Sequence, residues 1–289
     1  MRCLVLSLGE AALLRFAVIL ALASTMVSPA DAFTPTADQK ACATLPANAD
    51  VVAACTRIIE APSSSTLDRA VSYTFRADAA RADGNTTTAI ADYSQALSLM
   101  PTLVPALSGR GTAYRATGDF DRAIQDYDQA IKLNPNDATA FYYRGIANGQ
   151  RGESDRAIQD FSQAIKINPN HVDALYSRGL TYSNKGLWDR AIQDYDKAIK
   201  LDPNEAIPLN NRGSAYYQIG QVDRAIQDFD LAIKLNPNYP DALNNRGLAY
   251  TGKGQYDRAI QDFDRALRLD PKDADAIRYR AEAIAKKNN

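Results

Sequence analysis

The feature that most constrains this chain is a proline that recurs every 34 residues, at Pro101, Pro135, Pro169, Pro203, Pro237 and Pro271. The sequence before each proline is nearly constant: residues 121–134 read DRAIQDYDQAIKLN, and residues 257–270 read DRAIQDFDRALRLD. A fixed period of this length is typical of proteins that stack one supersecondary unit many times. Counting back from each proline defines six units, 70–103, 104–137, 138–171, 172–205, 206–239 and 240–273.

Each unit contains two helical patterns. In the first half, position 4 is usually a large apolar residue, position 8 is Gly or Ala and position 11 is usually Tyr, as in Leu107, Gly111 and Tyr114. A Gly at position 15, such as Gly118, fits the left-handed residue that ends a helix. The second half opens with an Asp such as Asp121, which suits the positive end of a helix, and then carries Ala, an aromatic residue and Ala at positions 20, 24 and 27. The proline at position 32 stops this second helix.

These markers resemble the tetratricopeptide repeat, and the resemblance covers residues 70–273. It implies an all-α fold, a right-handed solenoid of six helix–turn–helix units. Each pair of helices leaves an apolar face that only the next unit covers, so the units are expected to stack. Residues 274–289 start a seventh first helix and end in polar residues, so we interpret them as a C-terminal capping helix.

The first 32 residues are predicted to be a Sec-type signal peptide. Arg2 and Arg15 precede the apolar run 16–27, and the Ala30-x-Ala32 pattern suits cleavage after Ala32. The mature chain would then start at Phe33 in the periplasm or outside the cell, with no membrane span. The alternative is an uncleaved N-terminal anchor, but the charge-free run is short for a transmembrane helix.

Residues 33–69 do not repeat cleanly, and we interpret them as an N-terminal helical cap in which residues 50–60 look like a degenerate second helix. After signal cleavage this cap contains the two remaining cysteines, Cys42 and Cys55. An even pair in an exported protein favours one disulfide, and two unpaired buried cysteines are the alternative. The segment also resembles the cysteine-containing lead-in of exported bacterial tetratricopeptide proteins.

In the tetratricopeptide family the concave groove is lined mainly by first-helix positions 2, 5, 6, 9, 12 and 13, so the resemblance implies a partner-binding surface there. The residues predicted to bind a partner are Tyr142, Tyr143, Gln150, Tyr176, Asn184, Asn210, Asn211, Tyr217, Gln218, Asn244 and Asn245. Tyrosines and amides suit an extended peptide, because they combine rigid apolar area with donors and acceptors for its backbone. The alternative is a polar face that only keeps the protein soluble.

Some family members hold a C-terminal carboxylate with Lys and Asn at positions 5 and 9 and further basic residues in the next units. This chain has no such set, because position 5 carries Thr74, Ser108, Tyr142, Tyr176, Asn210 and Asn244. Recognition of cytosolic heat-shock tails is therefore not expected.

Two charged series follow the repeat, an Arg at position 7 and an Asp at position 23. The arginines are Arg76, Arg110, Arg144, Arg178, Arg212 and Arg246, and the aspartates are Asp92, Asp126, Asp160, Asp194, Asp228 and Asp262. A structural ladder of ion pairs is favoured over a charged binding strip, because half-buried charges need partners. Arg280 has no Asp in its own unit, so Asp262 is a candidate partner, and pairing within or between units stays open.

Composition bounds the function. The formal net charge is −1, from 33 Lys and Arg against 34 Asp and Glu, which does not favour nucleic acid. His171 is the single histidine, and the carboxylates follow the structural period, so no enzyme, metal site or cofactor is predicted. The predicted function is a protein–protein interaction scaffold of the bacterial cell envelope. The alternative is a periplasmic chaperone for unfolded clients, or a secretion and envelope-assembly accessory. The oligomeric state stays open.

Overall fold

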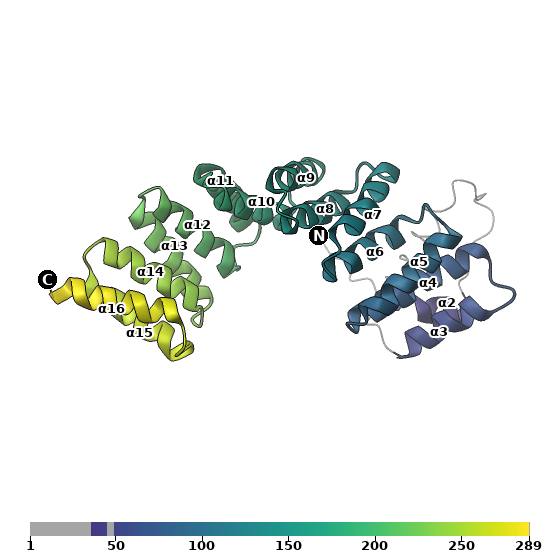
Figure 1. The fold of residues 1–289 in the computed structure, drawn as a ribbon, viewed down its shortest axis with the longest axis horizontal. Coiled ribbons are helices and arrows are strands. Elements are labelled where there is room, and N and C mark those ends of the chain that lie inside the picture. The colour runs from purple at the N-terminus through teal and green to yellow at the C-terminus, as the bar shows by residue number, and fades with distance from the viewer. Residues whose placement is uncertain (1–35, 45–48, 289) are drawn as a thin grey trace, which may run out of the picture. The chain divides into compact units, whose positions relative to one another are not determined.

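In the computed structural model, residues 36–44 and 49–288 are described. The predicted signal peptide, residues 1–32, and its cleavage site lie outside the described residues. This described part forms fifteen helices and no strand, which confirms the predicted all-α fold (Figure 1).

The helices follow the predicted units. Two helices precede the repeats, α2 (Ala37–Cys42) and α3 (Ala49–Glu60). The first helices of the units are α4 (Thr66–Ala82), α6 (Val104–Ala116), α8 (Ala138–Gln150), α10 (Val172–Asn184), α12 (Ala206–Gln218) and α14 (Pro240–Gly252). The second helices are α5 (Thr86–Leu99), α7 (Phe120–Leu133), α9 (Ser154–Ile167), α11 (Trp188–Leu201), α13 (Val222–Leu235) and α15 (Tyr256–Leu269). The segment interpreted as a capping helix forms α16 (Ala274–Asn288).

The chain divides into two compact parts, one ending at Glu153 and one beginning at Ser154. In the first part α4 packs on α5 and α6 on α7, and each second helix also packs on the first helix of the following unit (Figure 1). In the second part the same pattern joins α10 to α11, α12 to α13 and α14 to α15, and α16 covers α15. Within each part, consecutive helix pairs thus cover one another along the chain, as stacked repeats require.

The predicted turns form because glycine is placed where the backbone needs it. Gly118, at position 15, has φ of +80°, a conformation that costs residues with a Cβ energy. The chain can then reverse within a few residues, and the backbone N–H of Asp119 donates to the carbonyl of Tyr114 at 2.9 Å. The Asp119 carboxylate accepts from the backbone N–H of Arg122 at 3.1 Å, so α7 is capped by Asp119 rather than by Asp121. The five equivalent glycines also have positive φ: Gly84, Gly152, Gly186, Gly220 and Gly254.

Within a unit, a small residue at position 8 faces the aromatic residue at position 24. A Cβ added to Gly213 would lie 2.7 Å from Cε1 of Phe229 and 3.2 Å from the carbonyl oxygen of Ala225. Phe229 is 1% exposed, and the equivalent aromatic residues are buried in the same way: Tyr93, Tyr127, Phe161, Tyr195 and Phe263. The repeat therefore conserves close approach of its two helices around one buried ring, as protein interiors are close-packed.

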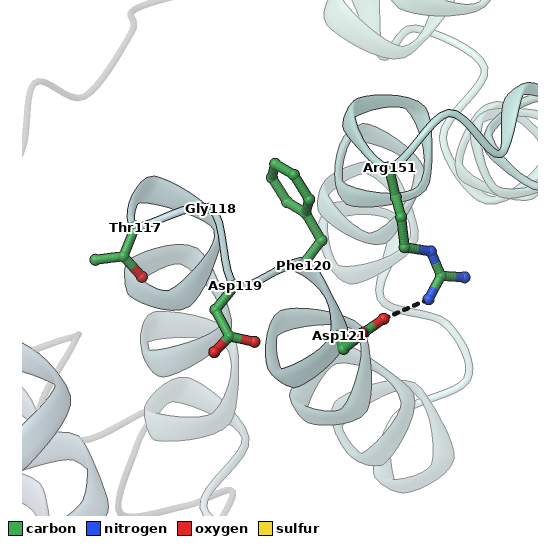
Figure 2. A pocket seen from close by; sticks show the side chains of 6 residues that line it. All are labelled: Thr117, Gly118, Asp119, Phe120, Asp121 and Arg151. Atoms are coloured by element: carbon green, nitrogen blue, oxygen red, sulfur yellow. Dashed lines mark hydrogen bonds and ion pairs between the residues drawn. The ribbon is translucent and has the colours of Figure 1, made fainter.

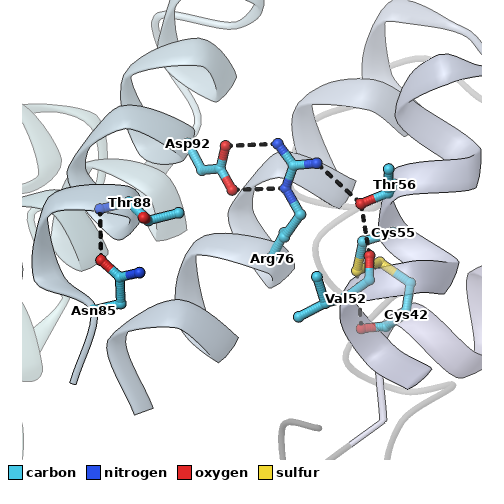
Figure 3. A network of polar contacts seen from close by, with 8 residues as sticks. All are labelled: Cys42, Val52, Cys55, Thr56, Arg76, Asn85, Thr88 and Asp92. Carbon is cyan, nitrogen blue, oxygen red and sulfur yellow. Dashed lines mark hydrogen bonds and ion pairs between the residues drawn. A yellow bond between two sulfur atoms is a disulfide. The ribbon is translucent and has the colours of Figure 1, made fainter. Parts of the chain in front are cut away.

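Five of the position-7 arginines, Arg76, Arg110, Arg178, Arg212 and Arg246, each join three helices, in an arrangement that we call the arginine clamp. Nε and Nη2 of Arg178 donate to both carboxylate oxygens of Asp194 at 2.8 and 2.7 Å, which ties α10 to α11. Nη1 donates to Oγ of Ser162 in α9 at 2.9 Å. Figure 3 shows the first clamp, in which Arg76 bonds Asp92 twice and Thr56 of α3 once. The clamp thus works both within and between units, which settles the question that the sequence leaves open.

One candidate pairing is wrong. Nε of Arg280 donates to Asp264 at 2.5 Å, not to Asp262. Asp262 is already held by Nε and Nη2 of Arg246 at 2.8 and 2.6 Å. Arg280 therefore keeps only the contact to position 25 of the preceding unit, because α16 has no second helix of its own unit among the described residues.

The N-terminal cap forms two helices that cover α4. The Sγ atoms of Cys42 and Cys55 lie 2.11 Å apart, at disulfide distance, and both residues are buried (Figure 3). Nε2 of Gln39 donates to Asp68 of α4 at 2.8 Å, so α2 is tied to the first repeat as well as to α3. A crosslink over a 13-residue separation restricts the unfolded chain and stabilises the fold by about 3 kcal/mol.

Candidate partner-binding face

The candidate site is the A-helix face, which we define as unit positions 2, 5, 6, 9, 12 and 13 of the first helices. The structure places the predicted residues of the first part on α8: Tyr142, Tyr143 and Gln150. It places the others on α10, α12 and α14 of the second part: Tyr176, Asn184, Asn210, Asn211, Tyr217, Gln218, Asn244 and Asn245.

In the second part, tyrosine and amide side chains form one hydrogen-bonded network across three helices. Nδ2 of Asn211 donates to the hydroxyl of Tyr176 at 3.0 Å, and Nδ2 of Asn210 donates to Oδ1 of Asn211 at 3.3 Å. Nδ2 of Asn245 then donates to Oδ1 of Asn210 at 3.0 Å and contacts Oγ of Ser214 at 3.3 Å. Asn210 is only 4% exposed, so its amide mainly joins α12 to α14.

Asn244 is also buried and has a structural contact that sequence reasoning did not foresee. Its Nδ2 donates to Oδ2 of Asp273 at 2.7 Å, while its Oδ1 is buried and accepts no hydrogen bond in the described part of the chain. Asp273 caps α16 by accepting from the backbone N–H groups of Asp275 and Ala276, each at 3.0 Å. The hydrogen bond from Ala276 is the main reason that the pKa of Asp273 is lowered, although burial opposes it. Asn244 therefore anchors the start of α16.

The tyrosine hydroxyls of this network stay protonated at neutral pH. Burial raises the pKa of Tyr176, although its hydrogen bond from Asn211 works against the rise. Burial also raises the pKa of Tyr239, at the start of α14, to about 12. Both hydroxyls can therefore donate as well as accept.

The exposed part of this face includes apolar side chains that the sequence prediction missed. Asn184 and Gln218 are exposed as predicted, and Tyr217 is half-buried. Leu180 on α10 is 39% exposed and Ile207 on α12 is 48% exposed. They occupy positions 9 and 2 of the family pattern, whereas the predicted set contains only tyrosines and amides.

In the first part, the predicted tyrosines pack against the aromatic core. The rings of Tyr142 and Tyr143 lie 5.1 Å apart, and the ring of Tyr143 stacks at 6.2 Å from that of Tyr127. Gln150 is exposed, and its Oε1 accepts from Nη1 of Arg115 at 3.3 Å. Arg115 was not among the predicted residues, although it stands at position 12 of the A-helix face.

Comparison with known families agrees with this geometry. A family model described as a tetratricopeptide repeat matches residues 210–274 and 246–289, a second matches residues 111–152 and 149–186, and a third matches residues 172–205. Together these matches cover more than half of the 289 residues. The chain is a tetratricopeptide repeat protein.

Solved structures have the same fold. One chain of the APC/C hetero-tetramer Cut9–Hcn1 is 20% identical to this protein, with a TM-score of 0.62. The match covers 81% of this protein and 52% of the Cut9–Hcn1 chain, so this protein spans about half the length of that chain. The protein MamA is 30% identical with a TM-score of 0.54, over 58% of this chain and 92% of that one. YrrB, described as a TPR protein with an unusual peptide-binding site, is 21% identical with a TM-score of 0.58, over 65% and 97%. A comparison with curated sequences finds no match.

The family sets the broad function. As a tetratricopeptide repeat protein, this chain is a protein–protein interaction scaffold, and proteins of this family are in general not catalytic. No helix of the described residues is both long and apolar enough to cross a membrane. His171, the single histidine, caps α10, where its Nδ1 accepts from the backbone N–H of Ala174 at 3.4 Å.

A shallow pocket of about 370 Å³ lies at the turn between α6 and α7, away from the A-helix face (Figure 2). It is lined by Thr117, Gly118, Asp119, Phe120, Asp121 and Arg151. Nη1 of Arg151 donates to Asp121 at 2.6 Å, and Asp119 is bonded to Arg122, so its charged groups are paired within the protein. These contacts make the pocket part of the repeat junction.

Proposed function

We propose that this protein is a scaffold of the bacterial cell envelope that binds an extended peptide on its A-helix face. Residues 1–32 direct export and are removed after Ala32, and the mature chain acts in the periplasm or outside the cell. The proposed role is binding and not catalysis, and no cofactor is required.

The observation that carries the proposal is the surface of the second part. Leu180 and Ile207 leave apolar area exposed on two neighbouring first helices. Exposed Asn184 and Gln218 lie on the same helices. Apolar area beside amide groups suits a peptide backbone with apolar side chains. The buried amides hold these helices in register, so the surface is formed before the partner arrives.

Selection from a displayed library of random peptides tests the binding site. The wild-type protein is expected to select peptides, and Leu180→Glu with Ile207→Glu should weaken the selected peptides at least about tenfold, or roughly 1.4 kcal/mol. Leu235→Glu with Leu269→Glu is the matched control, because these side chains are 41% and 38% exposed on second helices. Equal weakening by both pairs would move the site off the A-helix face. Binding of unfolded proteins without sequence preference would favour a chaperone instead.

Export has its own test. We expect mass spectrometry of the protein from a bacterial periplasm to find Phe33 as the first residue. Cys42 and Cys55 should resist alkylation until a reductant is added, because a disulfide persists in an oxidising compartment. A chain that keeps residues 1–32 and reacts fully without reductant would contradict the proposed export.

A further inference from the structure

The first part of the chain contains an arginine whose charge the protein does not balance. The clamp arginines on α4 and α6 are each held by a carboxylate: Arg76 by Asp92 at 2.7 Å and Arg110 by Asp126 at 2.8 Å. Arg115, on the A-helix face of α6, has no carboxylate within ion-pair distance in the described part of the chain. Its side chain is half-buried, where an unpaired charge is costly.

The neighbours of Arg115 are neutral. Its Nη1 donates to the amide of Gln150, and its charge lies close enough to the Tyr127 hydroxyl to oppose the rise that burial causes in the pKa of that group. The Tyr127 hydroxyl is in turn 3.0 Å from Oγ1 of Thr112. None of these partners carries the negative charge that would neutralise a guanidinium.

The polar atoms of α6 are also not saturated by the protein. Nε of Arg115 and Oγ of Ser108 are both buried and have no hydrogen-bond partner among the described residues. Ser108, Thr112 and Arg115 are spaced by four and three residues, so they share one face of the helix. Most buried polar atoms are paired, so this face of α6 has polar groups that its own chain does not satisfy.

A second arginine stands at the same unit position on the neighbouring first helix. Arg81 on α4 is 42% exposed in its side chain and lies 3.7 Å from Oδ1 of Asp78. The same oxygen of Asp78 accepts from the hydroxyl of Tyr93 at 2.5 Å. Asp78 is the one acidic residue at the A-helix-face positions of α4, α6 and α8, so the two arginines outnumber it.

On the A-helix face, the charged residues of the second part are acidic instead of mainly basic. At the same positions of α10, α12 and α14 the charged residues are Asp173 and Asp241, and no Lys or Arg is present. The basic character is therefore confined to the first part. It does not follow the repeat, as a purely structural ladder would.

We propose that Arg115, with Arg81, forms a subsite for an aspartate or glutamate side chain of a peptide that lies on the A-helix face of the first part. The inference rests on the proposed function and adds the chemistry of the partner: an extended segment that is acidic where it meets α4 and α6. A carboxylate can accept from the outer guanidinium nitrogens, and such charge-assisted hydrogen bonds are the strong ones. The acid is an internal side chain, so no C-terminal carboxylate is required.

Selection from the displayed peptide library tests this inference, and the quantity measured is the amino-acid composition of the selected peptides. Peptides chosen by the wild-type protein should be enriched in Asp and Glu. Arg81→Gln with Arg115→Gln should abolish that enrichment. Lys132→Gln with Lys166→Gln removes the same charge from exposed positions of second helices and should leave the enrichment intact. For one selected peptide, replacing its Glu by Gln should weaken binding to the wild-type protein about tenfold and binding to the Arg81/Arg115 variant hardly at all.

Two outcomes would overturn the inference. One is a wild-type selection without acidic enrichment, and the other is enrichment that persists in the Arg81→Gln, Arg115→Gln variant with its helical circular dichroism unchanged. If peptides are still selected and still depend on Leu180 and Ile207, the proposed function stands and only the acidic subsite is wrong. If no variant and no wild-type protein selects any peptide, both fail together.

Discussion

Replacing Arg178 by Met is expected to lower the free energy of unfolding of the second part by about 3–5 kcal/mol, because it leaves Asp194 as a buried, unpaired charge. Asp194 is 3% exposed and receives two hydrogen bonds from the guanidinium, so the pair is shielded from solvent. The Met side chain retains much of the apolar volume of Arg, so the loss reports charge and hydrogen bonding rather than a cavity. Urea unfolding followed by circular dichroism measures the change.

A double variant separates the two causes. Arg178→Met with Asp194→Leu removes both charges, and most of the lost stability should return, because a buried ion pair is often replaceable by apolar residues. Lys200→Gln, at an exposed position of the same helix as Asp194, should change stability by less than about 0.5 kcal/mol. The clamp would be unimportant if Arg178→Met cost no more than Lys200→Gln.

Replacing Phe229 by Ala is expected to cost about 3–5 kcal/mol, because the ring fills the space between the two helices of its unit. A Cβ on Gly213 would already lie 2.7 Å from this ring, which shows how closely α12 approaches it. Removal of the ring leaves a cavity that the clamp and the neighbouring units prevent from collapsing. Hydrogen exchange of the α12 and α13 amides, together with urea unfolding, measures the effect.

Two control variants bracket this prediction. Leu231→Ala on the same helix should change stability by no more than about 0.5 kcal/mol, because Leu231 is 47% exposed. Phe229→Tyr should cost less than the alanine variant, because three units already carry a tyrosine at this position. In one of them, the Tyr195 hydroxyl lies 3.1 Å from Oγ of Ser183, within hydrogen-bond distance. A cost of Phe229→Ala close to that of Leu231→Ala would show that the ring does not hold the unit together.

Much of the fold follows from the sequence because the repeat is local. Gly118 predicts a turn, since only glycine adopts its positive φ without strain, and the structure has φ of +80° there. Gly213 and Phe229 predict close helix packing, because a small residue at position 8 leaves room for the ring at position 24 of the same unit. These signals act within one 34-residue unit, so they can be read from the order of residues alone.

The tertiary structure alone decided which polar groups are free to bind a partner. Asn210 and Asn244 match the groove positions of the family, yet both are buried and bonded to neighbouring units or to Asp273. Arg115 stands at an equally ordinary position, yet no described residue gives it a carboxylate partner. Whether a side chain is exposed, bonded or unbalanced depends on residues about 30 positions away along the chain. The sequence therefore determined the repeat and its packing. Which polar groups find a hydrogen-bond or ion-pair partner depends on how the helices pack together.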